Sequence, residues 1–285
     1  MKVLPFKIPK PENSALIYQV DKGLTFYDQL HAHEEIQISI VLKGSGNLIV
    51  GDTIGRYDEN DVVVLGSQLP HLFQSDENDE ESLMFTLFFS ESSFGSGFFE
   101  LNEFNEMKEF FQKSTKGMRL LDTKEAIKNE FLNLENYSKL ELVSGFFKIV
   151  KLITEAESKP LSTFIYEKHF TEKEGSRMSK VMSYAMQNYR KEITLDEIAD
   201  VANMTPNAFC RYFKKRTNKT FFQFLIEIRL ENACQLLSQK SEMSIAEISD
   251  QSGFRNIAFF NRKFKTYKET TPTQFRNESL GAKDF

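Results

Sequence analysis

The sequence predicts a two-domain protein of the α+β class, in which an N-terminal antiparallel β-barrel with appended helices precedes an all-α domain. Up to about residue 89, short apolar runs such as 36–40, 48–50 and 62–65 are separated by turns rich in Gly and Asp. This spacing is typical of antiparallel barrels and sandwiches. Beyond residue 90, apolar residues recur three and four positions apart, which predicts helices. The length of 285 residues is that of about two ordinary domains.

The two predicted domains comprise residues 1–170 and 171–285. In the first domain the helical pattern covers about residues 98–157, and these helices would pack against the barrel or against a partner subunit. The segment 171–176 is polar and contains a glycine, which predicts a linker. The remainder of the second domain has the helical period throughout.

Charge is distributed unevenly along the chain. Residues 176–285 hold 18 of the 36 basic and 12 of the 41 acidic residues, so their net charge is +6, against −11 for residues 1–175. This asymmetry predicts nucleic-acid contact through the C-terminal part. No apolar run approaches the roughly 18 residues that a membrane helix needs, and the N-terminus lacks the features of a secretory signal. The two cysteines form no disulfide framework, and we therefore expect a cytoplasmic protein without a membrane partner.

An internal repeat organises the C-terminal domain. Residues 194–217 align with residues 244–267 at an offset of 50 up to a central turn and of 51 beyond it. Each copy begins with a capping box, Thr194 with Glu197 and Ser244 with Glu247. The central turns carry Asn203 and Gly253, the residue types that best tolerate a positive φ. Both copies therefore predict a helix-turn-helix motif, and a long helix at 221–239 would fix their separation.

The second helix of each motif is basic and free of acidic residues. We expect these helices at 206–217 and 256–267, with Phe209, Phe213, Phe260 and Phe264 facing inward. The basic residues are Arg211, Lys214, Lys215 and Arg216 in the first, and Arg262, Lys263, Lys265 and Lys268, preceded by Arg255, in the second. In helix-turn-helix proteins the second helix reads the major groove.

These residues also carry a family resemblance. The strings are Arg229-Leu230-x2-Ala233-x2-Leu236-Leu237, then Ile248-x4-Gly253-Phe254-x5-Phe260-x-Arg262-x-Phe264-Lys265, then Thr271-Pro272-x2-Phe275-Arg276. With them, residues 176–280 resemble the DNA-binding domain of AraC/XylS-type transcriptional regulators. Two departures are Asn203 in place of the usual turn glycine, and Glu269-Thr270 where a glycine normally precedes Thr-Pro. The resemblance implies a sequence-specific, non-enzymatic regulator, an activator whose partners are double-stranded DNA and RNA polymerase.

The resemblance also implies which side chains meet DNA. Arginine pairs with guanine and asparagine with adenine, Ile and Ala touch the thymine methyl group, and lysines further along meet phosphate. Two different helix-turn-helix motifs on one chain predict a non-palindromic half-site whose two determinants lie about 10 base pairs apart. A homodimer would bind two copies of this half-site. The expected DNA-contact residues are Asn207, Cys210, Arg211, Lys214, Lys215, Asn256, Ile257, Ala258, Asn261, Arg262 and Lys265.

Three of the four histidines fall in the predicted barrel. His31-Ala-His33-x3-Gln37 and Gly66-Ser67-x2-Pro70-His71 resemble the two cupin motifs, and residues 31–74 are similar to sensor domains attached to this regulator family. In cupin enzymes such histidines and a carboxylate hold a divalent metal. Here Gln37 stands at the carboxylate position, and a neutral amide is a weak ligand, so we expect no metal and no cofactor. The fourth histidine, His169, is expected at the surface.

The preferred interpretation is a pocket for a small polar effector such as a sugar. Alternation along a strand would place residues 31, 33, 35 and 37 on one face, where Glu35 could replace the missing carboxylate. The alternatives are structural histidines, a metal-dependent cupin enzyme, a DNA-architectural protein, and a regulator whose barrel only dimerises. An enzyme would leave the repeat unexplained, and an architectural protein would need no barrel. The expected effector-binding residues are His31, His33, Glu35, Gln37 and His71.

Overall fold

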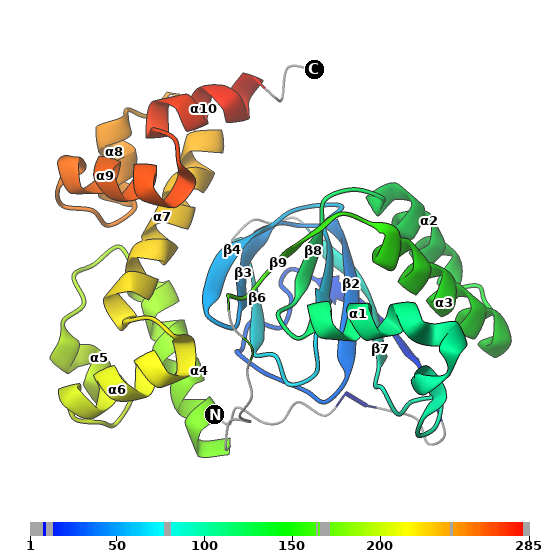
Figure 1. The fold of residues 1–285 in the computed structure, drawn as a ribbon. Coiled ribbons are helices and arrows are strands. Elements are labelled where there is room, and N and C mark those ends of the chain that lie inside the picture. Colours follow the sequence, from blue (N-terminus) through cyan, green and yellow to red (C-terminus); the bar gives the residue numbers. More distant parts are fainter. Residues whose placement is uncertain are drawn as a thin grey trace. The chain divides into compact units, whose positions relative to one another are not determined.

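The computed structural model describes residues 8–9, 14–76, 81–163, 165, 172–239 and 242–281. The chain divides into two compact units, Met1–Ser176 and Arg177–Phe285 (Figure 1). Among the described residues no helix is both long enough and apolar enough to cross a membrane. His169 lies outside the described residues.

The first unit contains two antiparallel sheets. A six-stranded sheet has the order β1-β7-β2-β5-β8-β9 and a three-stranded sheet has the order β4-β3-β6. The strands are β1 Ile17–Gly23, β2 Ile36–Lys43, β3 Gly46–Val50, β4 Thr53–Tyr57, β5 Val62–Leu65, β6 His71–Ser75, β7 Ser82–Phe89, β8 Met118–Leu120 and β9 Ser158–Pro160. The predicted antiparallel β domain is confirmed, but strand pairing within the described residues gives two sheets and not one closed barrel.

The central strands β2, β5 and β7 of the six-stranded sheet are buried on both faces, which explains why most of their residues are apolar. On one face Ile36, Ile38 and Ile40 of β2 join a core with the helices that follow β7. On the other face Val41, one residue on in the alternation, joins a core with residues of the three-stranded sheet such as Leu48. Figure 1 shows these three layers, with α1, α2 and α3 on one side of the sheet and β3, β4 and β6 on the other.

Along the chain, the helices of the first unit come between strands of the larger sheet: α1 between β7 and β8, and α2 and α3 between β8 and β9. Two short 3-10 turns, Phe98–Glu100 and Asn102–Phe104, lead into α1 (Asn105–Ser114), which is followed by α2 (Lys124–Leu134) and α3 (Lys139–Glu155). This matches the predicted helical region. The strands β8 and β9, which flank α2 and α3 in the chain, were not predicted, because three residues are too few to show an alternating period.

The second unit is all helical. Its helices are α4 Glu172–Asn188, α5 Leu195–Val201, α6 Pro206–Thr217, α7 Phe221–Gln239, α8 Ile245–Gln251, α9 Ile257–Lys268 and α10 Pro272–Gly281. Figure 1 shows α7 running from the group α4, α5 and α6 to the group α8, α9 and α10. The predicted linker at 171–176 is wrong from Glu172 onward, because those residues form the first turns of α4, where Gly175 is buried.

The local features predicted for the repeat are confirmed. Both capping boxes are present, with the hydroxyls of Thr194 and Ser244 accepting from the backbone N–H three residues on. Asn203 has φ 50° and Gly253 has φ 84°, so both turns use the left-handed region. Each motif thus consists of two helices joined by a turn whose geometry the residue type permits.

Candidate DNA-reading helices and a histidine cluster

Helix α6 is anchored by two fully buried phenylalanines. The ring centroid of Phe213 lies 5.6 Å from that of Phe221 and 5.8 Å from that of Phe224, and Phe209 lies 5.7 Å from Phe221. Because a helix turns 100° per residue, this anchor directs the opposite face outward. The predicted contact residues on that face are all exposed: Asn207, Cys210, Arg211, Lys214 and Lys215.

Helix α9 has the same construction. Phe260 and Phe264 are fully buried, and Phe264 packs against Phe275 of α10. The side chain of Asn256 accepts from the backbone N–H of Phe259, so this residue is the N-cap of α9 as well as a predicted contact. The predicted contact residues here are also exposed: Asn256, Ile257, Ala258, Asn261, Arg262 and Lys265.

Some of the basic residues counted on these helices have structural partners. Lys268 Nζ lies 2.8 Å from Oε1 of Glu231 on α7, a carboxylate that is only 6% exposed. Arg255 lies 2.7 Å from Glu192, both at the surface, and Arg216 is half-buried. Fewer basic side chains are therefore exposed on the two helices than the sequence indicates, and they are Arg211, Lys214, Lys215, Arg262 and Lys265.

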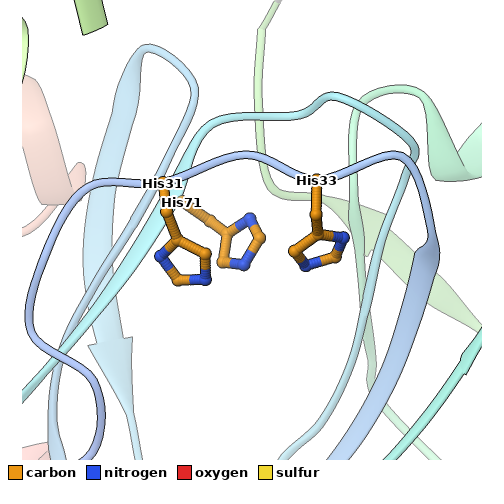
Figure 2. Close-up of side chains that lie close together, drawn as sticks. All are labelled: His31, His33 and His71. Atoms are coloured by element: carbon orange, nitrogen blue, oxygen red, sulfur yellow. The ribbon is translucent and has the colours of Figure 1, made fainter. Parts of the chain in front are cut away.

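Three histidines from distant segments converge in the first unit (Figure 2). His31 and His71 form an isolated antiparallel bridge, with backbone N–H···O distances of 3.0 and 2.9 Å, and their ring centroids are 4.2 Å apart. The ring of His33 lies 5.0 Å from that of His71 and 5.9 Å from that of His31. All three residues are buried, and one ring nitrogen of each lies within 4.8 Å of the other two.

The same hydrogen bond orients each of the three rings. Nδ1 lies 2.8 Å from a backbone carbonyl oxygen two residues away: that of Gln29 for His31, Glu35 for His33 and Leu69 for His71. A carbonyl oxygen only accepts, so Nδ1 of each ring carries a proton and donates this hydrogen bond.

Burial keeps the rings neutral. Desolvation lowers the pKa of His31 to about 4 and also lowers the pKa of His33 below its ordinary value. For His71 burial and the two neighbouring imidazoles place the pKa well below that value. Nε2 of His71 is buried and has no hydrogen-bond partner among the described residues. Buried polar atoms are normally hydrogen-bonded, so a group that donates to this nitrogen would stabilise it.

A chain of buried polar groups extends from the cluster along the face between the two sheets. Gln37 lies 3.2 Å from Nε2 of His33 through its amide oxygen and donates a 2.8 Å hydrogen bond to the hydroxyl of Ser39. The Ser39 hydroxyl is 2.8 Å from that of Thr86, its partner across β2 and β7. Ser39 and Thr86 were not predicted, although a polar residue inside an otherwise apolar strand was a signal for them.

The alternation argument for Glu35 is wrong. The chain bends at residues 34–35 and β2 begins only at Ile36, so residues 31–37 are not one strand. The Glu35 side chain is 18% exposed, and its Oε2 lies 3.9 Å from Nδ1 of His33, the nitrogen that donates to the backbone. Glu35 therefore does not join the nitrogens that converge, and His31, His33, Gln37 and His71 make up the buried set.

Comparison with known proteins defines the class. Residues 198–278 match the family model of a helix-turn-helix domain. The chain is 23% identical over 265 residues to an uncharacterized HTH-type transcriptional regulator, YdeC of Bacillus subtilis, covering 90% of this chain and 89% of that protein. It is likewise 23% identical over 260 residues to the Msm operon regulatory protein of Streptococcus mutans, with the same two coverages. A lactose operon transcription activator of Staphylococcus xylosus is 31% identical over 90 residues, 32% of each chain.

The fold, the repeat and these similarities together define a helix-turn-helix DNA-binding protein. More particularly, it is similar over nearly its whole length to transcriptional regulators, with a β-rich domain ahead of a DNA-binding domain whose sequence resembles that of the AraC family. The relatives are transcriptional regulators and not enzymes, which agrees with the prediction from the repeat.

Proposed function

We propose that α6 and α9 read base sequence directly and that the N-terminal domain controls this reading by binding a small ligand. The observation that carries the proposal is that every predicted contact side chain is exposed on two helices with equivalent places in a repeated motif. Both helices are free of acidic residues, so no charge on them opposes a phosphate backbone.

The contacts divide by chemistry. Arg211 and Arg262 can pair bidentately with guanine, and Asn207 and Asn261 with adenine, while Cys210, Ile257 and Ala258 offer apolar contact. Three lysines lie further along the helices and would contact phosphate groups: Lys214, Lys215 and Lys265. Asn256 would contact DNA in addition to capping α9. Because α7 is one continuous helix, it fixes the separation of the two helix-turn-helix motifs. The motifs would then read adjacent major-groove faces about 34 Å apart.

The ligand site of the proposal is the buried set His31, His33, Gln37 and His71. Buried polar groups are stable when a ligand or a closed network satisfies them, and Nε2 of His71 is left without a partner by the described residues. A small polar effector that supplies a donor to this nitrogen would complete the network. Similarity to the Msm operon regulatory protein over nearly its whole length supports control of an operon, and we propose activation through RNA polymerase.

The proposed assembly is a homodimer formed through the helices of the first unit. Leu132 of α2 and Leu140 of α3 are exposed apolar residues, 43% and 79% exposed, on the outer layer of that unit. Two chains would then present two copies of a long, non-palindromic half-site.

The test is selection of binding sites from random duplex DNA with the full chain, followed by footprinting on the DNA beside its own gene. We expect two determinants about 10 base pairs apart within each half-site. A single short palindrome would contradict the arrangement. For the ligand, a thermal-shift screen of small metabolites compares the wild-type chain with His33→Ala, which should lose the response while retaining DNA affinity.

A further inference from the structure

We infer that Arg229 of α7 fixes the orientation of one helix-turn-helix motif relative to the other, and thereby the spacing of base determinants that the chain accepts. The inference rests on the base reading proposed above and adds a positioning residue that acts through the protein backbone. Helix α7 sets how far apart the motifs lie. Each motif is nevertheless a small group of helices packed on α7, and small units joined in this way move relative to each other unless a further contact holds them.

The turn between α8 and α9 lies against the loop between α4 and α5, which belongs to the other group of helices. Gly253 in this turn shows how close the approach is, because a Cβ added to it would lie 2.6 Å from the carbonyl oxygen of Tyr189 and 2.9 Å from Cα of Arg190. Two backbones this close leave no room for a side chain. The second motif therefore rests directly on the loop that leads into the first motif.

Arg229 joins three elements at this contact. From α7, its Nε donates to the carbonyl oxygen of Tyr189 at 2.7 Å and its Nη2 donates to that of Lys191 at 2.8 Å. The same Nε would lie 3.0 Å from a Cβ at Gly253, so the guanidinium is in contact range of the turn as well. A guanidinium is planar and its donors have fixed directions, so two bonds to two carbonyls set the angle between the helix and the loop.

Apolar packing does not close the junction. A cavity of about 300 Å³ lies beside Arg229 and Gly253, and side chains of both α7 and α9 line it, among them Phe222, Leu225 and Phe259. Phe222 is 42% exposed. Because the facing apolar side chains leave this space unfilled, the polar contacts of Arg229 carry more of the constraint than packing does.

An ion pair crosses the same junction at the surface. Arg255, in the turn of the second motif, lies 2.7 Å from Glu192 in the loop between α4 and α5, and both side chains are well exposed. Exposed pairs of this kind contribute only about 0–1 kcal/mol. The pair is therefore the weaker of the two polar links, and Arg229 is the stronger.

A fixed orientation limits the DNA sites that both motifs can read together. One additional base pair moves the second determinant about 3.4 Å along the duplex and about 35° around it. Motifs held rigidly cannot follow this change, whereas motifs that rock on α7 can follow it in part. Loss of the Arg229 contacts should therefore relax the preference for spacing more than the preference for bases.

The first measurement needs no DNA. Spin labels are placed on the full chain at Cys210 of α6 and at the equivalent position of α9, introduced as Asn261→Cys, while Cys234 is buried. Labelled chains are diluted with unlabelled ones, so that electron-electron resonance reports distances within one chain. We expect a narrow distance distribution without further substitution and a clearly broader one with Arg229→Gln. Arg229→Lys, which keeps the charge but reaches one carbonyl, should lie between them.

The second measurement uses the site selected by the wild type, together with two duplexes whose determinants are one base pair closer or further apart. We expect the wild type to bind the altered duplexes about 100-fold more weakly, because one motif loses its bases. Arg229→Gln should lose only about 10-fold on them, with unchanged base preference within each determinant. This ratio does not depend on the folded fraction, so a merely structural role would leave it at the wild-type value.

Arg190→Gln is the matched control. It removes one positive charge from the same junction, but the Arg190 side chain is exposed and contacts the ring of its neighbour Tyr189. Both measurements should match the wild type. Glu192→Gln, which breaks the exposed pair, should change both by less than Arg229→Gln does.

The inference is overturned if Arg229→Gln has a distribution as narrow as the wild type, or if it weakens binding to all three duplexes by one factor. Circular dichroism establishes folding, and if Arg229→Gln does not fold, Arg229→Lys and Glu192→Gln decide by the same two measurements. A wild type that binds all three duplexes alike, with distance distributions as expected, refutes reading by two motifs and leaves the fixed orientation intact. An unchanged distribution in Arg229→Gln, with a wild type that prefers one spacing, refutes only the role of Arg229.

Discussion

Ser162 donates a 2.8 Å hydrogen bond to the carboxylate of Asp52, and both residues are 2% exposed. The backbone N–H of Thr163 donates to the same carboxylate at 2.9 Å. Asp52 lies in the turn between β3 and β4, where the N–H of Gly51 bonds the carbonyl of Pro70, the neighbour of His71. The turn therefore links the histidine cluster to residues 162–163, which follow β9 in the chain.

We predict that Asp52→Asn destabilises the first unit and weakens the response to ligand. The asparagine side chain has the same shape but no charge, and its NH₂ group would face the Ser162 and Thr163 donors. A hydrogen bond to a charged group contributes about 1.5–3 kcal/mol. A loss of about 2 kcal/mol should lower the melting temperature by roughly 4–8 °C. Circular dichroism measures the melting, and titration of labelled DNA with and without ligand measures the response.

The matched control is Asp122→Asn. Asp122 also accepts a backbone N–H, that of Glu157 at 2.8 Å, but it is exposed to solvent. Its replacement should cost less than about 1 kcal/mol, because water can take over the bond. Equal melting temperatures for the two variants would show that the Asp52 carboxylate does not hold the chain at Ser162.

A second prediction concerns Glu231, which holds Lys268 and thereby the end of α9. Glu231→Gln removes the negative charge that pairs with the buried side of the Lys268 ammonium, and we expect a loss of about 1–3 kcal/mol in unfolding free energy together with weaker DNA binding. Because the chain has no tryptophan, unfolding in urea is followed by circular dichroism. Glu109→Gln, which breaks the exposed pair with Lys113, is the control and should cost no more than about 0.5 kcal/mol. If Glu231→Gln also lowered the unfolding free energy by no more than about 0.5 kcal/mol, the buried pair with Lys268 would contribute no more than the exposed pair.

The C-terminal domain could be predicted nearly residue by residue because its signals are local. A capping box, a positive φ at the turn and a 3.6-residue period each act within a few residues of chain, and all three recur in the second copy. The first turns of α4 escaped prediction because their residues are polar and include Gly175, which is buried by packing that no local signal reports. The partners of Lys268 and Arg255 escaped for a similar reason, since they lie on other elements.

The N-terminal domain was predicted less completely because pairing between strands is not local. The strands β8 and β9 exist because β5 and β8 offer edges to pair with, not because their own sequences favour them. His31 and His33 are close in sequence, but His71 joins them only through the bridge between His31 and His71. The family resemblance anticipated this convergence, whereas strand alternation alone placed Glu35 wrongly.

A third prediction compares equivalent positions in the two turns. A Cβ at Gly253 would lie 2.6 Å from the carbonyl oxygen of Tyr189 and 2.9 Å from Cα of Arg190, and its φ of 84° disfavours any side chain. Gly253→Ala should therefore cost about 2 kcal/mol or more. Asn203→Gly, in an exposed turn with φ 50°, should change stability by less than about 0.5 kcal/mol. Thermal melts and DNA titrations of both variants measure the difference, and similar melts would refute the close packing of the second turn.

The last prediction separates base reading from phosphate contact on α9. Arg262→Ala should cost about 1–3 kcal/mol on the preferred site and relax the preference at one base pair, because a bidentate contact with guanine is lost. Lys265→Ala should weaken all sequences alike and reduce the slope of affinity against salt concentration by about 1. Arg211→Ala and Lys214→Ala should behave in the same two ways on α6, whereas Lys139→Ala, at an exposed position of the first unit, should leave DNA affinity unchanged. Affinities for the selected site, its single-base variants and unrelated duplexes at several salt concentrations decide between the roles. If Arg262→Ala lowered every affinity by the same factor and reduced the salt slope, Arg262 would be a phosphate contact, and base reading by α9 would rest on Asn261 and its apolar neighbours.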